Sequence, residues 1–280
     1  MIGPWARLGI FLLVMAAPFI LVVVPIGTFL VYSFWSVENH QIVPNATLAN
    51  YVGFFRNDIY VGVFLQTLLL CAKVTLISLI VGYPIAYFLW RQRGSRKYVL
   101  LLLFILPLFM SYIVKIYTMR SILGLSGFLN QILVGSGLLA KPSLLFLYNQ
   151  TSILITMAVV FLPFLILPIF LSLERIPRGL MQASADLGAG PATTFRHVVV
   201  PLSLPGVVAG CLFTFVLALG DFITPQMVGG PSGFTFGRVI WSQFGLAYDW
   251  PFGAALGAIL LGVALLVIVA AGYAMRKQRV

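Results

Sequence analysis

Three ionisable residues, Lys73, Lys115 and Asp221, fall inside long apolar runs of this 280-residue chain. Charged groups within a membrane are costly, so such residues commonly mark an ion pair or a pathway for a charged solute. Asp221 stands in the sequence ALGDFITP, where Thr224 and the following proline break the helix and can expose carbonyl oxygens beside the carboxylate. Asp221 is therefore predicted to contact a cationic substrate or to pair with one of the two lysines, and the two roles are compatible.

Three aromatic residues, Trp241, Tyr248 and Trp250, occupy the last loop before the final apolar run. Aromatic rings can hold an amine by cation–π contact, and Trp241 is our candidate for such a role in a substrate pathway. More often such residues anchor a protein at the lipid–water interface. Lys73 and Lys115 argue against a simple path for a cation, unless they face lipid headgroups or a partner subunit.

The chain carries no recognisable catalytic, metal-binding or nucleotide-binding motif. His40 and His197 lie far apart in different loops, no two cysteines have metal-ligand spacing, and the glycine-rich phosphate loop ending in Gly-Lys-Ser/Thr is missing. We expect no catalytic residue, metal or cofactor on this chain, so any ATP that drives it must be hydrolysed on another chain. Cys71 and Cys211 both fall in apolar runs, where reduced, buried thiols are the better interpretation.

The composition is that of a polytopic membrane protein rather than a soluble domain. Hydrophobic residues make up 61% of the chain, charged residues make up 8%, and the mean hydropathy is +1.08. The net charge of +11 is compatible with nucleic-acid binding, but the basic residues cluster in short loops beside the apolar runs. Membrane lipid, and no nucleic acid, is the partner that this composition predicts.

About 20 apolar residues are needed to cross a bilayer as a helix. Six segments meet this requirement: 8–34, 63–90, 99–117, 152–173, 204–223 and 252–274. We therefore expect an all-α integral membrane protein in which residues 1–280 form a single transmembrane domain. Prolines within several of these segments predict bent helices, whose freed carbonyls are satisfied by their neighbours.

Basic residues gather on one side of this six-span arrangement, as they do in cytoplasmic loops. That side includes both termini and loop 174–203, and it holds 11 of the 17 basic residues, namely Arg7, Arg91, Arg93, Arg96, Lys97, Arg175, Arg178, Arg196, Arg276, Lys277 and Arg279. The opposite loops hold Arg56, Arg120, Lys141 and Arg238. Both termini and loop 174–203 are thus predicted to be cytoplasmic.

Residues 121–140 are apolar enough to resemble a seventh span, but serine, glycine and amide residues interrupt them. A full crossing would place either the basic C-terminus or loop 174–203 on the outer side, against the charge distribution. The favoured alternative is a short interfacial or re-entrant helix on the outer face.

Loop 174–203 combines a short amphipathic helix, a glycine break and a proline restart. Pro177 suits the first helical position, where its missing N–H is tolerated. Gly188 and Gly190 suit a left-handed stop, and Pro191 prevents the helix from continuing. Such a helix–turn–helix between two spans is suited to bind another protein, although an ordinary amphipathic connector would show the same sequence pattern.

The same loop resembles the cytoplasmic EAA loop of permease subunits in binding-protein-dependent ABC importers. The motif reads Glu-Ala-Ala, three residues, Gly, nine residues, Ile, one residue and Leu-Pro, and its positions are occupied here by Gln182, Ala183, Ser184, Gly188, Val198, Val200 and Pro201. The spacing is intact, and the neighbouring Asp186 and Leu187 also fit. The resemblance implies a coupling helix that docks into a cleft on an ATPase subunit, although Gln182 leaves no carboxylate at the first motif position.

The stretch 218–231, with its LGDFITP and VGGP elements, is similar to the fifth-span region of PotB-type permeases from spermidine/putrescine importers. This resemblance implies the six-span fold of type I ABC importer permeases in a bacterial inner membrane. It also implies a second, PotC-like permease, two ATP-binding subunits that carry ATP and Mg, and a periplasmic or surface substrate-binding protein. Relatives for other amines, opines or phosphonates share much of this stretch.

Two other functional classes remain open. A secondary transporter or channel would use Asp221 and the lysines for ion coupling, and would transport without an ATPase. A membrane scaffold subunit would need no pathway, so that Asp221→Asn would be silent and changes in the loop would disturb only complex formation.

Overall fold

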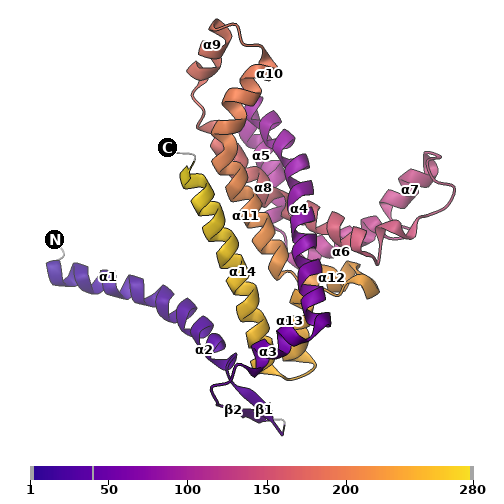
Figure 1. The fold of residues 1–280 in the computed structure, drawn as a ribbon. Coiled ribbons are helices and arrows are strands. Elements are labelled where there is room, and N and C mark those ends of the chain that lie inside the picture. The colour runs from indigo at the N-terminus through magenta and orange to yellow at the C-terminus, as the bar shows by residue number, and fades with distance from the viewer. Residues whose placement is uncertain (1–2, 40, 278–280) are drawn as a thin grey trace. The chain divides into compact units, whose positions relative to one another are not determined.

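The computed structural model describes residues 3–39 and 41–277, so that His40 and Arg279 lie outside the described residues. Nearly all of the described chain is helical (Figure 1). Contacts between residues divide it into two compact units, one of residues 1–62 with 239–262 and the other of residues 63–238 with 263–280. The expectation of a single transmembrane domain stays a prediction.

The first unit begins with a long apolar helix in three parts. These parts are α1 (Pro4–Pro18), the π-helical turn η1 (Phe19–Val23) and α2 (Val24–Tyr32). Pro18 and Pro25 each remove a backbone N–H donor close to η1, which explains why the helical pitch changes there. The stretch Gly9–Tyr32 is long and apolar enough to cross a membrane and corresponds to the expected span 8–34.

A small ordered connection follows this first span. Strands β1 (Ser36–Glu38) and β2 (Gln41–Val43) form an antiparallel ribbon, and α3 (Ala49–Arg56) comes next. The Asn50 side chain donates to the carbonyl oxygens of Ser33 (2.9 Å) and Trp35 (2.8 Å). These bonds fix the start of α3 against the end of the first span.

The C-terminal helices are α13 (Phe236–Gly245) and α14 (Trp250–Lys277), and α14 contains the expected span 252–274. Within the first unit, the ring of Phe244 on α13 lies 5.2 Å from that of Phe29 and 5.8 Å from that of Trp250, measured between centroids. Aromatic packing therefore connects the first span to the last one in this unit.

The second unit consists of long helices with shorter ones at their ends (Figure 1). In chain order its elements are α4 (Asp58–Arg91, mostly in this unit), α5 (Arg96–Ile105), η2 (Leu106–Phe109), α6 (Tyr112–Leu123), α7 (Phe128–Gly135), η3 (Leu144–Phe146), α8 (Gln150–Glu174), α9 (Arg178–Asp186), α10 (Pro191–Thr194), η4 (Phe195–Val199), α11 (Val200–Gly220), α12 (Ile223–Val228) and η5 (Gly230–Ser232). The short helices α9 and α10 lie together at one end of α8 and α11 (Figure 1).

Helices α8 and α11 form the most extensive pair in this unit, and glycines allow their backbones to approach closely. A Cβ atom at Gly206 would lie 2.5 Å from the carbonyl oxygen of Pro168, and one at Gly210 would lie 2.8 Å from that of Leu165. Both distances are shorter than a van der Waals contact, so any larger residue must push the helices apart.

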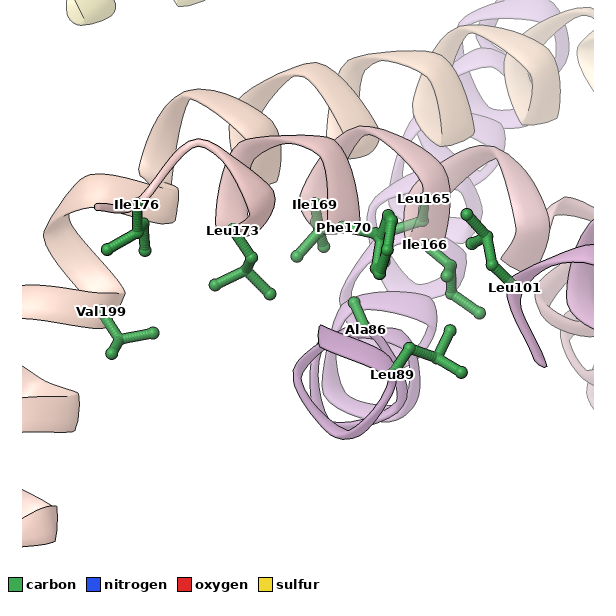
Figure 2. Close-up of a cluster of buried hydrophobic side chains, with 10 residues drawn as sticks. All are labelled: Ala86, Leu89, Leu101, Leu165, Ile166, Ile169, Phe170, Leu173, Ile176 and Val199. Atoms are coloured by element: carbon green, nitrogen blue, oxygen red, sulfur yellow. The ribbon is translucent and has the colours of Figure 1, made fainter. Parts of the chain in front are cut away.

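A buried apolar cluster joins α8 to α4, α5 and η4 (Figure 2). Leu165, Ile169 and Leu173 repeat every four residues and so lie on one face of α8, and Ile166 and Phe170 form an adjacent line with the same spacing. The buried face of α8 is therefore wider than a single line of residues. The members of the cluster are Ala86, Leu89, Leu101, Leu165, Ile166, Ile169, Phe170, Leu173, Ile176 and Val199.

An ion pair lies at the end of α8 that leads into loop 174–203. Lys97, near the start of α5, contacts the carboxylate of Glu174, the last residue of α8. Lys97 is buried, so its charge needs a partner of opposite sign. The pair ties α5 to α8 just before loop 174–203 begins.

The expected third span, 99–117, is not one straight helix. The chain leaves α5 through η2, is extended at Met110, and starts α6 at Tyr112, so that Arg96–Phe109 and Tyr112–Gly135 are bent by 101°. Pro107 lacks the N–H that a continuing helix needs, which explains the break. The described residues contain five helices able to cross a membrane, or six if this bent pair is one span.

Helix α7 falls within the apolar stretch 121–140. It has 8 residues and is therefore about 12 Å long, too short for a seventh span.

The expected fifth span, 204–223, differs from the structure at both ends, because α11 starts earlier, at Val200, and stops at Gly220. Cys71 and Cys211 are free thiols, as expected, and Cys71 is buried, whereas Cys211 is only half-buried.

Candidate functional site

Asp221 lies at the break between α11 and α12, where its backbone is extended (φ −77°, ψ 114°). Its Oδ1 atom accepts hydrogen bonds from the backbone N–H groups of Ile223 (3.0 Å) and Thr224 (3.1 Å). The carboxylate therefore caps the first turn of α12, a role for which aspartate is well suited.

Tyr112, the first residue of α6, is the main side-chain partner of Asp221. Its hydroxyl donates to Asp221 Oδ2 at 2.6 Å and lies 2.9 Å from the hydroxyl of Thr224. Because the Tyr112 proton points to the carboxylate, the Thr224 hydroxyl donates in the second contact. One cluster of three side chains thus joins the break between α5 and α6 to the break between α11 and α12.

The predicted ion pair between Asp221 and Lys73 or Lys115 does not form. Among the described residues the only ion pair is that of Lys97 and Glu174. The Lys115 ammonium instead lies 5.5 Å from the centre of the Tyr112 ring, and Lys73 is exposed on α4. Tyr112 and the backbone occupy the positions around the carboxylate that a lysine would need.

A cavity of about 190 Å³ opens beside this cluster. Its walls include Asp221, Tyr112 and Phe161, with Leu217 and Phe222 completing much of the lining. The rings of Tyr112 and Phe161 are nearly parallel (16°), with centroids 6.4 Å apart. Asp221 is only 8% exposed, so the cavity combines a poorly hydrated carboxylate with aromatic rings.

The three candidate pathway residues are placed differently. Asp221 lines the cavity, whereas Thr224 is fully buried and supports Asp221 through Tyr112. Trp241 is half-buried on α13 and belongs to the other compact unit. A role for Trp241 in the substrate pathway therefore stays a prediction, as does a direct role for Thr224.

Loop 174–203 forms two short helices, α9 and α10, in the described structure. Pro177 precedes α9 as its N-cap in an extended conformation rather than occupying the first helical position, a difference of one residue from the expectation. Gly188 ends the helix with φ +77°, in the left-handed region that favours glycine. Gly190 is the N-cap of α10 and Pro191 its first residue.

The surface of the loop is exposed, as a docking element requires. Leu187, at the end of α9, is 88% exposed, and so large an exposure of an apolar side chain is typical of a contact with another protein. The motif residues Gln182, Ala183 and Gly188 are also exposed, as is the neighbouring Asp186. Pro201 is exposed near the start of α11.

Ser184 differs from the other motif residues because its hydroxyl is engaged within the loop. It lies 2.8 Å from the hydroxyl of Thr194, which is buried on α10. This bond joins the two short helices, so Ser184 is placed to position the loop. The sequence showed only that Ser stands where the motif has Ala.

A cavity of about 590 Å³ lies under the loop. Gln182 and Met181 of α9 form one side, and Trp90 and Arg91 at the end of α4, with Arg93 in the following turn, contribute to the other. The loop therefore rests over a recess whose walls are partly basic and partly aromatic.

A family of proteins described as "Binding-protein-dependent transport system inner membrane component" matches residues 5–280. The chain belongs to this family. It is thus a permease component of an ABC importer in the inner membrane, as expected from the loop motif, and it is not the ATPase of the system.

Curated relatives support the same assignment. The permease is 34% identical over 224 residues to the spermidine/putrescine transport system permease protein PotB of Haemophilus influenzae, covering 80% of this chain and 78% of the relative. It is 37% identical over 275 residues to the inner membrane ABC transporter permease protein YdcU of Escherichia coli, covering 89% and 84%.

Solved structures share the fold of the permease. A bacterial ABC transporter involved in the import of the acidic polysaccharide alginate aligns with a TM-score of 0.77 at 16% identity, over 98% of this chain and 96% of the other. The MetNI methionine ABC transporter, in an inward-facing conformation, aligns with a TM-score of 0.60 at 18% identity, over 79% and 99%. The type I importer permease fold is confirmed.

Proposed function

We propose that this permease forms half of the translocation pathway of an ATP-driven importer for polyamines such as spermidine and putrescine. The observation that carries the proposal is the Asp221 carboxylate, which is 8% exposed, faces an aromatic-lined cavity and has no basic partner in an ion pair among the described residues. A buried negative charge without a counter-cation favours a cationic ligand.

The alternatives among importer substrates are distinguished by charge. A phosphonate, or the carboxylate of an opine, would place a second negative charge close to Asp221. At a separation of about 4 Å and an effective dielectric constant of about 20, such a repulsion costs about 4 kcal/mol. An ammonium group is instead attracted by the negative charge of Asp221 and by cation–π contact with the faces of Tyr112 and Phe161. The similarity to PotB supports the same choice.

The proposed complex contains a second, PotC-like permease, two ATP-binding subunits that bind ATP and Mg, and a periplasmic or surface substrate-binding protein. Both termini and loop 174–203 face the cytoplasm in this arrangement, in agreement with the distribution of basic residues. Exposed Leu187 inserts into a cleft of one ATPase subunit, and the closure of the ATPase dimer then biases the permeases between inward-open and outward-open states.

The test is ATP hydrolysis by the reconstituted complex of both permeases and the ATPase subunits. Its binding protein is loaded in turn with spermidine, putrescine, a phosphonate and an opine. We expect stimulation with the two polyamines only. Stimulation by another ligand would be consistent with an ATP-driven importer but would contradict the polyamine assignment. Uptake that proceeds without any ATPase subunit would support a secondary transporter.

A further inference from the structure

A second cavity of the same unit, of about 320 Å³, has no role in the function proposed above. It lies between residues 63–70 of α4, the first turn of α8 and the segment that precedes α13, and its polar lining consists of Gln66, Thr67, Gln150 and Thr235. Within the part of the chain that the structure describes, no charged side chain lines it. It is therefore a neutral, hydrogen-bonding cavity, in contrast to the one beside Asp221.

The walls of this cavity are fixed by contacts that do not need a ligand. The Thr67 hydroxyl donates to the carbonyl oxygen of Val63 (2.8 Å) and accepts from the backbone N–H of Phe236 (2.9 Å). The rings of Phe64 and Phe236 pack edge to face with centroids 5.0 Å apart. The cavity is thus built on packed helices and is formed in advance, as ligand sites commonly are.

Three polar groups of the lining have no partner among the described residues. The side-chain amides of Gln66 and Gln150 belong to exposed residues and form no hydrogen bond with another described residue. The Thr235 hydroxyl is buried without a hydrogen-bond partner, and Thr235 is 5% exposed. Buried hydroxyls usually have hydrogen-bond partners, so this group indicates an interaction that the protein alone does not supply.

The neutral cavity adjoins the Asp221 cluster through one short segment. Thr235 lines the neutral cavity, and a Cβ atom at Gly237, two residues later, would lie 3.4 Å from the backbone oxygen of Asp221 and 3.5 Å from Phe222. The segment 235–237 therefore runs from the lining of the neutral cavity to the backbone of Asp221, and the two cavities share no lining residue. A ligand with several nitrogen atoms could use both sites, whereas a ligand with one nitrogen could use only one at a time.

We propose that Gln66, Gln150 and Thr235 form an uncharged amine subsite, which accepts an ammonium group of a di- or polyamine beside the Asp221 site. The proposal rests on the proposed function. Amide and hydroxyl oxygens accept hydrogen bonds from an ammonium group, but without a fixed negative charge they hold it less tightly than a carboxylate does. Such a subsite receives an amine without retaining it.

The experiment uses the complete reconstituted importer in proteoliposomes with binding protein loaded with spermidine. The double variant Gln66→Leu/Gln150→Leu removes both amides at similar side-chain size, and Gln226→Leu is the matched control, because Gln226 is exposed on α12 and lines neither cavity. Spermidine uptake and stimulated ATP hydrolysis are measured for each. Loss of hydrogen bonds to a charged group predicts uptake roughly 10-fold below the control.

The two measurements separate a subsite from a structural role. We expect the double variant to lose uptake while ATP hydrolysis stimulated by loaded binding protein stays at the control level. Equal uptake in the double variant and the control would overturn the subsite but not the proposed function. A parallel fall of uptake and stimulated ATP hydrolysis would also overturn the subsite, and would indicate a structural role for Gln66 and Gln150. Absence of spermidine uptake by the unmodified importer would overturn the proposed function, and the subsite with it.

Discussion

The Asp221 cluster and loop 174–203 represent two opposite ways of building a functional region. Asp221, Tyr112 and Thr224 are brought together from two helix breaks, are mostly buried, and satisfy one another by hydrogen bonds. The loop is local in sequence, and its motif residues are largely exposed, with Leu187 88% exposed. The first region depends on long-range packing, whereas the second depends on the caps and turns of a few consecutive residues.

This contrast means that the two regions should fail differently. Damage to the loop should disconnect the permease from ATP hydrolysis without changing what it can bind. Damage to the Asp221 cluster should change substrate handling without changing the assembly of the complex. Substitutions in each region test this separation, and the largest effect is expected in the loop.

Replacing residues 178–190 with a flexible Gly/Ser linker of the same length should abolish uptake. The replacement removes α9 and the left-handed turn at Gly188, and with them the proposed docking surface. Uptake and co-purification of the ATPase subunits are the measurements, with the amount of permease in the membrane as the control. Loss of the permease from the membrane would mark the loop as a folding element instead.

Asp221→Asn should lower polyamine uptake by about 10- to 100-fold, because hydrogen bonds to a charged group contribute about 1.5–3 kcal/mol. Asparagine caps a helix as well as aspartate does, so α12 should remain intact. Asp221→Ala is the comparison variant, since it also removes the cap and should cost about 1 kcal/mol of further stability. Unchanged uptake by Asp221→Asn would favour the scaffold function.

Tyr112→Phe should reduce uptake by roughly 3- to 10-fold. The substitution keeps the ring that stacks on Phe161 but removes the hydroxyl that donates to Asp221 Oδ2. Tyr117→Phe is the matched control on the same helix, because Tyr117 is exposed and forms no hydrogen bond with a described residue. Equal effects of the two variants would show that the Tyr112 hydroxyl does not support the site.

Ser184→Ala should have the smallest effect, less than about 3-fold on stimulated ATP hydrolysis. It removes one hydrogen bond between neutral groups, that to Thr194, and such a bond contributes about 1 kcal/mol or less when partly exposed. The thermal stability of the permease and its ATPase stimulation are both measured. A complete loss of stimulation would mean that Ser184 contacts the ATPase directly.

The sequence was informative where a structural feature depends on neighbouring residues. Hydropathy located the apolar helices, and glycine and proline located both ends of α9 and the start of α10, with Pro177 displaced by one position. Asp221 was identified because a carboxylate in an apolar run is rare. In each case the relevant residues stand close together in the chain.

The sequence was uninformative where distant residues meet. Tyr112 and Asp221 are 109 positions apart, and nothing local to Tyr112 distinguishes it from other tyrosines. For the same reason an ion pair with Lys73 or Lys115 was one of the two roles predicted for Asp221, whereas a tyrosine and backbone N–H groups surround the carboxylate. Pro107 predicted a bend in segment 99–117, but its size of 101° was not predicted, because hydropathy measures the apolar length of a segment and not its direction.

The glycine contacts between α8 and α11 have a mechanical consequence. Since neither Gly206 nor Gly210 leaves space for a Cβ atom, the backbones of the two helices are already in contact at these points and cannot move closer together there. The loop joins them at one end, and α11 reaches Asp221 at the other, about 31 Å away along its 21 residues. If α11 tilts as one body when the loop moves, the end of the helix at Asp221 is displaced in proportion to this length.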